Sequence, residues 1–143
     1  MTGKLKILFL CTGNSCRSQM AEGWTRYIKG NTIEPYSARI VAHGLNPRAV
    51  LVMKEVGVNI SKHTSKKVTS VMNISFDHVI TVCSDAEKYC PVFSGKVQVS
   101  HFSFDDPPSL ARFAQSEEEA LSHFRRVRDE IRAFIEILLP RQP

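Results

Sequence analysis

The sequence lacks most features of membrane, fibrous and disordered proteins. Among its 143 residues no apolar run approaches the roughly 20 needed to cross a bilayer, and the first residues make a poor signal peptide. Glycine and proline number only seven each, too few for a low-complexity chain. Aromatic residues make up 8% and are not interleaved with basic runs, which argues against nucleic-acid binding. We therefore expect one cytoplasmic domain over residues 1–143, without membrane association.

Net charge and cysteine content are the two features of the composition that indicate classes of function. The formal net charge of +5 favours anionic partners, although charge alone does not separate phosphate esters from small oxyanions. Four cysteines would suggest two disulfides in a secreted protein, and a metal site or redox chemistry in a cytoplasmic one. The four are Cys11, Cys16, Cys83 and Cys90.

Alternating apolar strands and amphipathic helices predict the fold class. Because strands alternate with helices, we expect an α/β domain with a four-stranded parallel sheet flanked by helices. Ligands of such sheets bind beyond the carboxyl ends of the strands, where Cys11 and Cys83 lie. The expected strands are 5–10, 35–42, 77–82 and 97–102, and the expected helices are 18–29, 47–56, 66–72 (weaker) and 116–139. Residues 102–115 form the longest irregular stretch, and Arg125, Arg126, Arg128 and Arg132 are expected on the solvated face of the last helix.

The segment from Cys11 to Arg17 has the spacing of an oxyanion-binding loop. Five residues between a strand end and a helix start can direct successive backbone N–H groups at a tetrahedral anion, and the Arg17 guanidinium can grip two of its oxygens. The same environment predicts that the pKa of Cys11 falls well below about 8.5, with Ser18 donating to the thiolate. Cys11 is thus a predicted nucleophile and Cys16 a filler. The predicted anion-binding residues are Thr12, Gly13, Asn14, Ser15, Cys16, Arg17 and Ser18.

The segment 11–23 closely resembles the active-site loop of thioredoxin-coupled arsenate reductases, which share the low-molecular-weight protein tyrosine phosphatase fold. The resemblance covers nearly the whole chain. It continues through residues 43–47, 63–65, 83–86, 90–91, 104–107 and 125–131.

This resemblance implies a reaction and a role for each thiol. Cys11 attacks arsenate, and Asp106 protonates the departing oxygen as general acid. Cys83 then attacks Cys11 and arsenite leaves; Cys90 next attacks Cys83, and thioredoxin reduces the resulting disulfide. The implied partners are arsenate and thioredoxin, with no cofactor, and we expect a monomer.

Other interpretations remain open at this stage. A low-molecular-weight tyrosine phosphatase would need only Cys11, Arg17 and Asp106, and an oxyanion or metal sensor would need only the loop. The cysteine spacings are looser than those of zinc knuckles, so no metal site is expected. The five histidines show no ligand spacing and are expected to be structural.

Two further expectations come from positions around the site. Some family members have a potassium site, which Asn14, Glu22, Ser37 and Thr64 match, but Lys66 replaces its aspartate; we predict that Lys66 pairs with Glu22 and that no potassium is required. In a continuous helix Cys83 and Cys90 would lie about 10 Å apart, beyond the reach of a disulfide at about 7 Å. Residues 84–89 are therefore predicted to unwind on oxidation.

Overall fold

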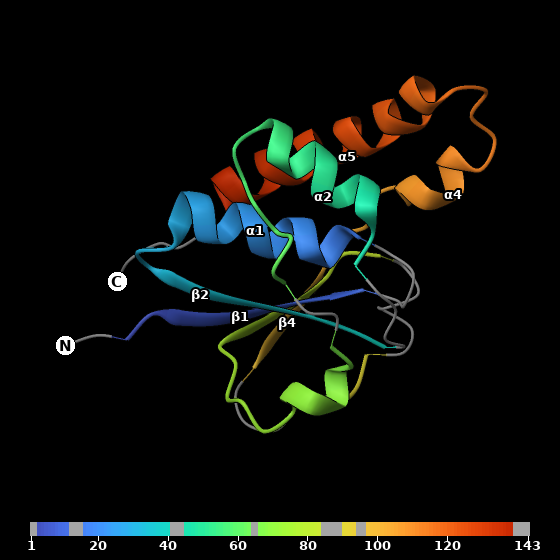
Figure 1. The fold of residues 1–143 in the computed structure, drawn as a ribbon. Helices are drawn as coiled ribbons and strands as arrows, with labels where there is room; N and C mark the ends of the chain where they lie inside the picture. The colour runs from blue at the N-terminus through green and yellow to red at the C-terminus, as the bar shows by residue number, and fades with distance from the viewer. Residues whose placement is uncertain are drawn as a thin grey trace.

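The computed structural model describes residues 3–11, 16–40, 45–63, 66–83, 90–93 and 97–138. Figure 1 shows the order of the elements along the chain. They are β1 (Leu5–Cys11), α1 (Arg17–Lys29), β2 (Ile33–Arg39), α2 (Pro47–Glu55), the 3-10 helix η1 (Val68–Val71), β3 (His78–Thr81), β4 (Gln98–His101), α4 (Pro107–Ala111) and α5 (Glu117–Ile137).

The strands form a four-stranded parallel sheet in the order β2-β1-β3-β4. Strand β1 lies in the interior of the sheet, and its residues from Ile7 to Cys11 are fully buried, which explains its nearly continuous apolar sequence. Because all strands run the same way, their carboxyl ends meet at one edge. This edge carries Cys11 and, next to it in register, Arg39.

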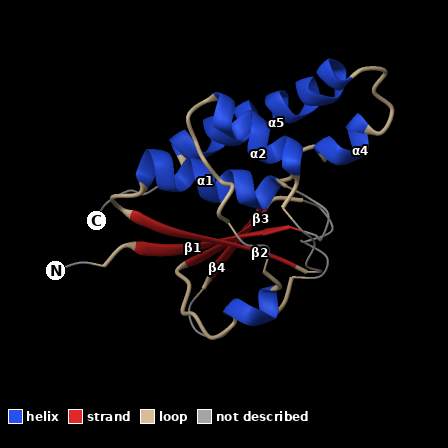
Figure 2. Cartoon of the chain, in the orientation of Figure 1, coloured by secondary structure: helices blue, strands red, loops and turns tan. Residues whose placement is uncertain are grey.

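Helices cover both faces of the sheet unequally. Helices α1, α2, α4 and α5 lie on one side, and the short η1 lies on the other (Figures 1 and 2). Helix α1 packs between the sheet and α5, and the indole Nε1 of Trp24 donates to the backbone oxygen of Arg128 at 3.0 Å. The predicted α/β domain with a parallel sheet is therefore confirmed. Among the described residues no helix has the length and apolarity to cross a membrane.

Several local predictions need correction. Residues 68–71 form a 3-10 helix instead of an α-helix, and the stretch 102–115 contains the unpredicted helix α4. Arg128 is not on a solvated face: it is 8% exposed, because its position on α5 faces α2. Its Nη1 donates to the carbonyl of Val52 at 2.9 Å and lies 3.1 Å from the carboxylate of Glu55.

Candidate active site

Cys11 ends the central strand and contacts the start of α1. Its side chain is fully buried, and Sγ lies 2.9 Å from Oγ of Ser18 in a hydrogen bond. Strand β1 continues to Cys11 because that residue still pairs with Arg39 of β2. Helix α1 starts at Arg17, and Ser18 lies in its first turn. The predicted contact between Ser18 and Cys11 is therefore present.

The predicted low pKa of Cys11 is wrong for this structure. Complete burial raises the pKa of the Cys11 thiol, because desolvation penalises the thiolate. Hydrogen bonds from the side chain and backbone of Ser18 lower the pKa, as does the charge of Arg39, but by less than burial raises it. Ser18 is thus the largest described influence in favour of the thiolate.

Arg17 connects the cysteine loop to the segment before α4. Its guanidinium is almost fully buried, and Nη1 donates to the backbone oxygen of Phe104 at 2.5 Å. Nη2 lies 3.7 Å from Oδ1 of Asp106. In addition, the charge of Asp106 raises the pKa of Cys16, so this carboxylate acts electrostatically on the loop. The structure thus brings together Arg17 and Asp106, which are distant in sequence.

Asp105 directly precedes Asp106 and is the other carboxylate that could serve as the general acid, but the structure places it elsewhere. Its carboxylate accepts from Nη2 of Arg126 at 3.0 Å on the surface of α5, and its side chain is 64% exposed. Asp106 instead occupies the N-cap position of α4, and its Oδ1 lies 3.7 Å from Nη2 of Arg17. Of the two carboxylates, only Asp106 has a described contact with the predicted anion site.

Of the other predicted relay thiols, Cys83 lies at the same edge of the sheet as Cys11. Cys83 follows β3 and is 3% exposed; the backbone N–H of the preceding Val82 donates to Leu10 at 2.9 Å, next to Cys11. A negative charge on Cys83 would raise the pKa of Cys11. Cys90 is half-buried, and burial raises its pKa. None of the four cysteines, all of which the structure describes, forms a disulfide, and the predicted switch segment 84–89 lies outside the described residues.

The remaining loop predictions are only partly covered. Thr12, Gly13, Asn14 and Ser15 lie outside the described residues. Cys16 is fully buried, and its burial together with the nearby Cys11 raises its pKa to about 12. Cys16 therefore stays protonated at neutral pH.

The predicted pairing of Lys66 with Glu22 is only partly described. The Glu22 carboxylate accepts from Oγ of Ser37 at 2.5 Å and from Nη2 of Arg26 at 2.9 Å. Asn14 and Thr64, the other positions that match a potassium site, lie outside the described residues. Among the described contacts, the cationic side chain that pairs with Glu22 is therefore that of Arg26.

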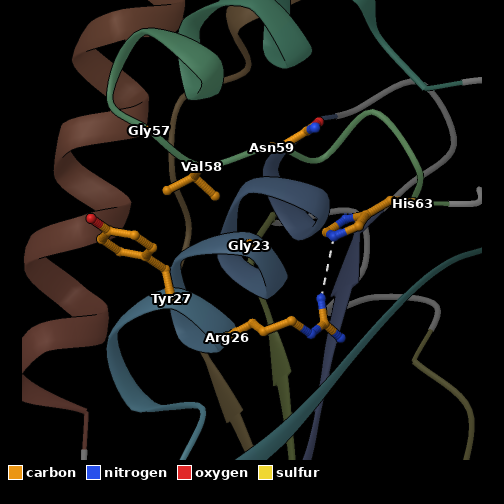
Figure 3. Close-up of a pocket in the computed structure, with 7 residues that line it drawn as sticks. All are labelled: Gly23, Arg26, Tyr27, Gly57, Val58, Asn59 and His63. Atoms are coloured by element: carbon orange, nitrogen blue, oxygen red, sulfur yellow. Dashed lines mark hydrogen bonds between the residues drawn. The ribbon is translucent and has the colours of Figure 1, made fainter.

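Arg26 also borders a surface pocket of about 350 Å³ that is distinct in its lining from the predicted site. Figure 3 shows Arg26 with His63, whose Nε2 lies 3.2 Å from Nη1 of Arg26. Nδ1 of His63 lies 2.9 Å from Oε1 of Gln19 on the other side of the ring. Because a guanidinium only donates, Nε2 accepts, and the amide oxygen fixes the proton on Nδ1. The pocket is lined by Gly23, Arg26, Tyr27, Gly57, Val58, Asn59 and His63.

Two of the described histidines join neighbouring strands. His78 lies 2.8 Å from Oγ of Ser100, and His101 lies 2.6 Å from Oγ1 of Thr81, in both cases joining β3 to β4. Within the described ranges, no group of three or more histidine, cysteine or acidic side chains is arranged to hold a metal ion.

Sequence reasoning missed two side chains near the site. Arg39 is 1% exposed and neighbours Cys11 across β1 and β2, and its position at the end of β2 was the available indication. Ser109 donates from Oγ to Oδ2 of Asp106 at 2.7 Å. It was missed because α4 was not predicted.

Comparisons with known proteins agree with this arrangement. The family model described as "Low molecular weight phosphotyrosine protein phosphatase" matches residues 6–142. Arsenate reductase from Bacillus subtilis (strain 168) is 53% identical over 125 residues, which are 87% of this chain and 88% of that relative. An arsenate reductase solved in the oxidized state has a TM-score of 0.76 at 29% identity, covering 92% of this chain and 93% of its own.

A further solved structure is a thioredoxin-dependent arsenate reductase from Corynebacterium glutamicum. It has a TM-score of 0.64 at 26% identity, covering 94% of this chain and 62% of its own. The family model spans nearly the whole sequence. The chain belongs to the low molecular weight phosphotyrosine protein phosphatase family, and within it resembles arsenate reductases.

Proposed function

We infer that this protein reduces arsenate to arsenite, using Cys11, Cys83 and Cys90 in turn, and that thioredoxin regenerates it. The observation that carries this proposal is the pair of buried thiols, Cys11 and Cys83, which lie at the ends of neighbouring strands. Hydrolysis of a phosphate ester requires only the first of them. The similarity to arsenate reductases over most of the chain supports the same reaction.

In the first step the thiolate of Cys11 attacks arsenic, with Arg17 holding the oxyanion. An As–S bond forms and an As–O bond breaks, and a hydroxyl oxygen leaves as water with the proton of Asp106. The buried thiol passes its proton to an oxygen of the bound arsenate before this attack, and that oxygen becomes the hydroxyl that leaves as water. Water is kept from the sulfur because Cys11 is fully buried.

In the second step the thiolate of Cys83 attacks the sulfur of Cys11. An S–S bond forms, the As–S bond breaks, and its electron pair stays on arsenic, which is thereby reduced from As(V) to As(III). The thiolate of Cys90 then attacks Cys83, which frees Cys11. Cys90 is the more exposed of these thiols, which favours access by a protein reductant.

The proposal includes no metal or organic cofactor, because the two electrons come from thiols. We place the reaction in the cytoplasm, where thioredoxin and glutathione keep cysteines reduced. We propose that a monomer is sufficient, since all the residues assigned here come from one chain.

The test is arsenite formation with thioredoxin, thioredoxin reductase and NADPH. We expect Cys11→Ser to form no arsenite and Cys83→Ser to form none above background. Cys90→Ser should release one arsenite per chain and then stop, because its disulfide is not passed on. Omitting thioredoxin from the wild type gives the matching single-turnover control. If Cys90→Ser cycles as fast as the wild type, the three-thiol scheme is wrong.

A second candidate activity is hydrolysis of aryl phosphates, including phosphotyrosine. The observation that favours it is the family to which the chain belongs, together with the contact between Arg17 and Asp106, whose charged atoms lie 3.7 Å apart. Cys83→Ser separates the two activities, because it removes reduction but leaves the hydrolytic residues in place. A wild type that hydrolyses p-nitrophenyl phosphate efficiently and forms no arsenite would make the phosphatase the principal function.

A further inference from the structure

The carboxylate of Asp106 has two oxygens in different surroundings. Oδ2 accepts a hydrogen bond from Oγ of Ser109 at 2.7 Å. Oδ1 is buried and has no hydrogen-bond partner within the described part of the chain, and it lies 3.7 Å from Nη2 of Arg17. Native structures rarely leave a buried carboxylate oxygen without a partner, so this one requires an explanation.

The sequence after Asp106 explains why only one oxygen is satisfied. Asp106 is the N-cap of α4, a position where an aspartate ordinarily accepts from the backbone N–H groups of the first turn. The next two residues are Pro107 and Pro108, which have no N–H to donate. Asp106 accordingly makes no backbone cap hydrogen bond from its side chain. Ser109 is the first residue of the helix that has a donor, and it is its hydroxyl that bonds to Asp106.

We propose that Ser109 is a positioning residue for the general acid, holding Oδ2 of Asp106 so that Oδ1 carries the transferred proton. This inference rests on the proposed function, in which Asp106 protonates the oxygen that leaves arsenic. A hydroxyl donates well to Oδ2 only if that oxygen is not itself protonated, so the proton resides on Oδ1. Oδ1 is also the oxygen nearest Arg17, the side chain that grips the anion.

The step balances within the reaction already described. The O–H bond on Oδ1 breaks, its proton passes to the departing hydroxyl, and water leaves as the As–O bond breaks. Asp106 ends as a carboxylate, which Ser109 and Arg17 both stabilise. Ser109 touches neither arsenate nor Cys11 in this scheme and acts only through Asp106.

The test measures the rate of the first arsenite released per enzyme in single-turnover experiments without thioredoxin. The variants are Ser109→Ala, Ser109→Thr, Asp106→Asn and the double variant Asp106→Asn with Ser109→Ala. Ser122→Ala is the matched control, since its hydroxyl donates to a backbone oxygen on the surface of α5. Thermal unfolding of each variant shows whether α4 and the rest of the fold are retained.

We expect Ser109→Ala to slow the first turnover about tenfold, the effect of losing one hydrogen bond to a charged group, with little change in the arsenate concentration for half-saturation. Ser109→Thr should restore most of the rate because it keeps the hydroxyl. Asp106→Asn should lose about 100-fold or more, as general acids do. In the Asp106→Asn background Ser109→Ala should cost nothing further, because the two residues act as one unit.

The outcomes separate this inference from the proposed function. If Asp106→Asn is slow but Ser109→Ala matches the wild type, or if Ser109→Ala slows both backgrounds equally, the positioning role is refuted. If Asp106→Asn is as fast as the wild type, or if the wild type forms no arsenite, the assignment of the acid fails first and the role of Ser109 falls with it.

Discussion

The hydrogen bond between Ser18 and Cys11 gives the sharpest test of how this site makes a nucleophile. Burial raises the pKa of Cys11, and the contacts from Ser18 are the largest described opposing influence. Ser18→Ala removes the side-chain bond at 2.9 Å and so should raise the pKa of Cys11 further. A hydrogen bond to a charged group contributes about 1.5–3 kcal/mol, and the lower end corresponds to about a tenfold loss of thiolate at neutral pH.

The assay is the rate of alkylation of Cys11 by iodoacetamide, followed by mass spectrometry of its peptide across a range of pH. The rate should rise with pH through the pKa of the thiol, and the Ser18→Ala curve should lie at higher pH than that of the wild type. Thr25→Val is a suitable control, because Thr25 is also buried on α1 but donates to the backbone oxygen of Ala21. Equal curves for Ser18→Ala and the wild type, or a curve shifted to lower pH, would refute the reasoning.

Three further predictions concern stability and ions. Burial lowers the pKa of His63, so below about pH 6.5 the unfolded chain binds more protons than the folded chain, and the free energy of unfolding should fall as the pH drops below that value. Urea unfolding at several pH values should show a weaker dependence of this free energy on pH in His63→Gln, and the dependence that remains should come from His78. Arg128→Met should lose about 2 kcal/mol of unfolding free energy, because it leaves a buried carbonyl of α2 without its donor. Arsenite formation should be the same in potassium and sodium salts, because Arg26 pairs with Glu22; potassium-specific activation would contradict this.

The sequence was most informative where one local pattern decides the structure. The apolar run before Cys11 required burial on both faces, and β1 is indeed an interior strand of a parallel sheet. The helical spacing of the apolar residues after Arg17 predicted a helix there, and α1 is present. The resemblance to arsenate reductases added Asp106, whose contact with Arg17 spans most of the chain and has no local pattern.

The errors arose where tertiary packing decides. Helix α4 has only five residues and opens with Pro107 and Pro108, so it shows no helical periodicity of its own. Arg128 was predicted on a solvated face because it is charged, but its angular position around the axis of α5 directs its side chain toward α2. The low pKa of Cys11 was predicted from the loop amides, the helix dipole and Ser18, whereas burial, which has the larger effect, depends on the whole fold.

A comparison of Cys11 with Cys16 shows how the site favours the ionisation of one thiol over that of the other. Cys11 and Cys16 are both fully buried, and desolvation is the largest influence on the pKa of each. Only Cys11 has the hydroxyl of Ser18 within hydrogen-bond distance, and a negative Cys11 raises the pKa of Cys16 further. Ionisation of one thiol therefore opposes ionisation of the other. Since Asp106 also raises the pKa of Cys16, the geometry favours one thiolate, and it favours Cys11.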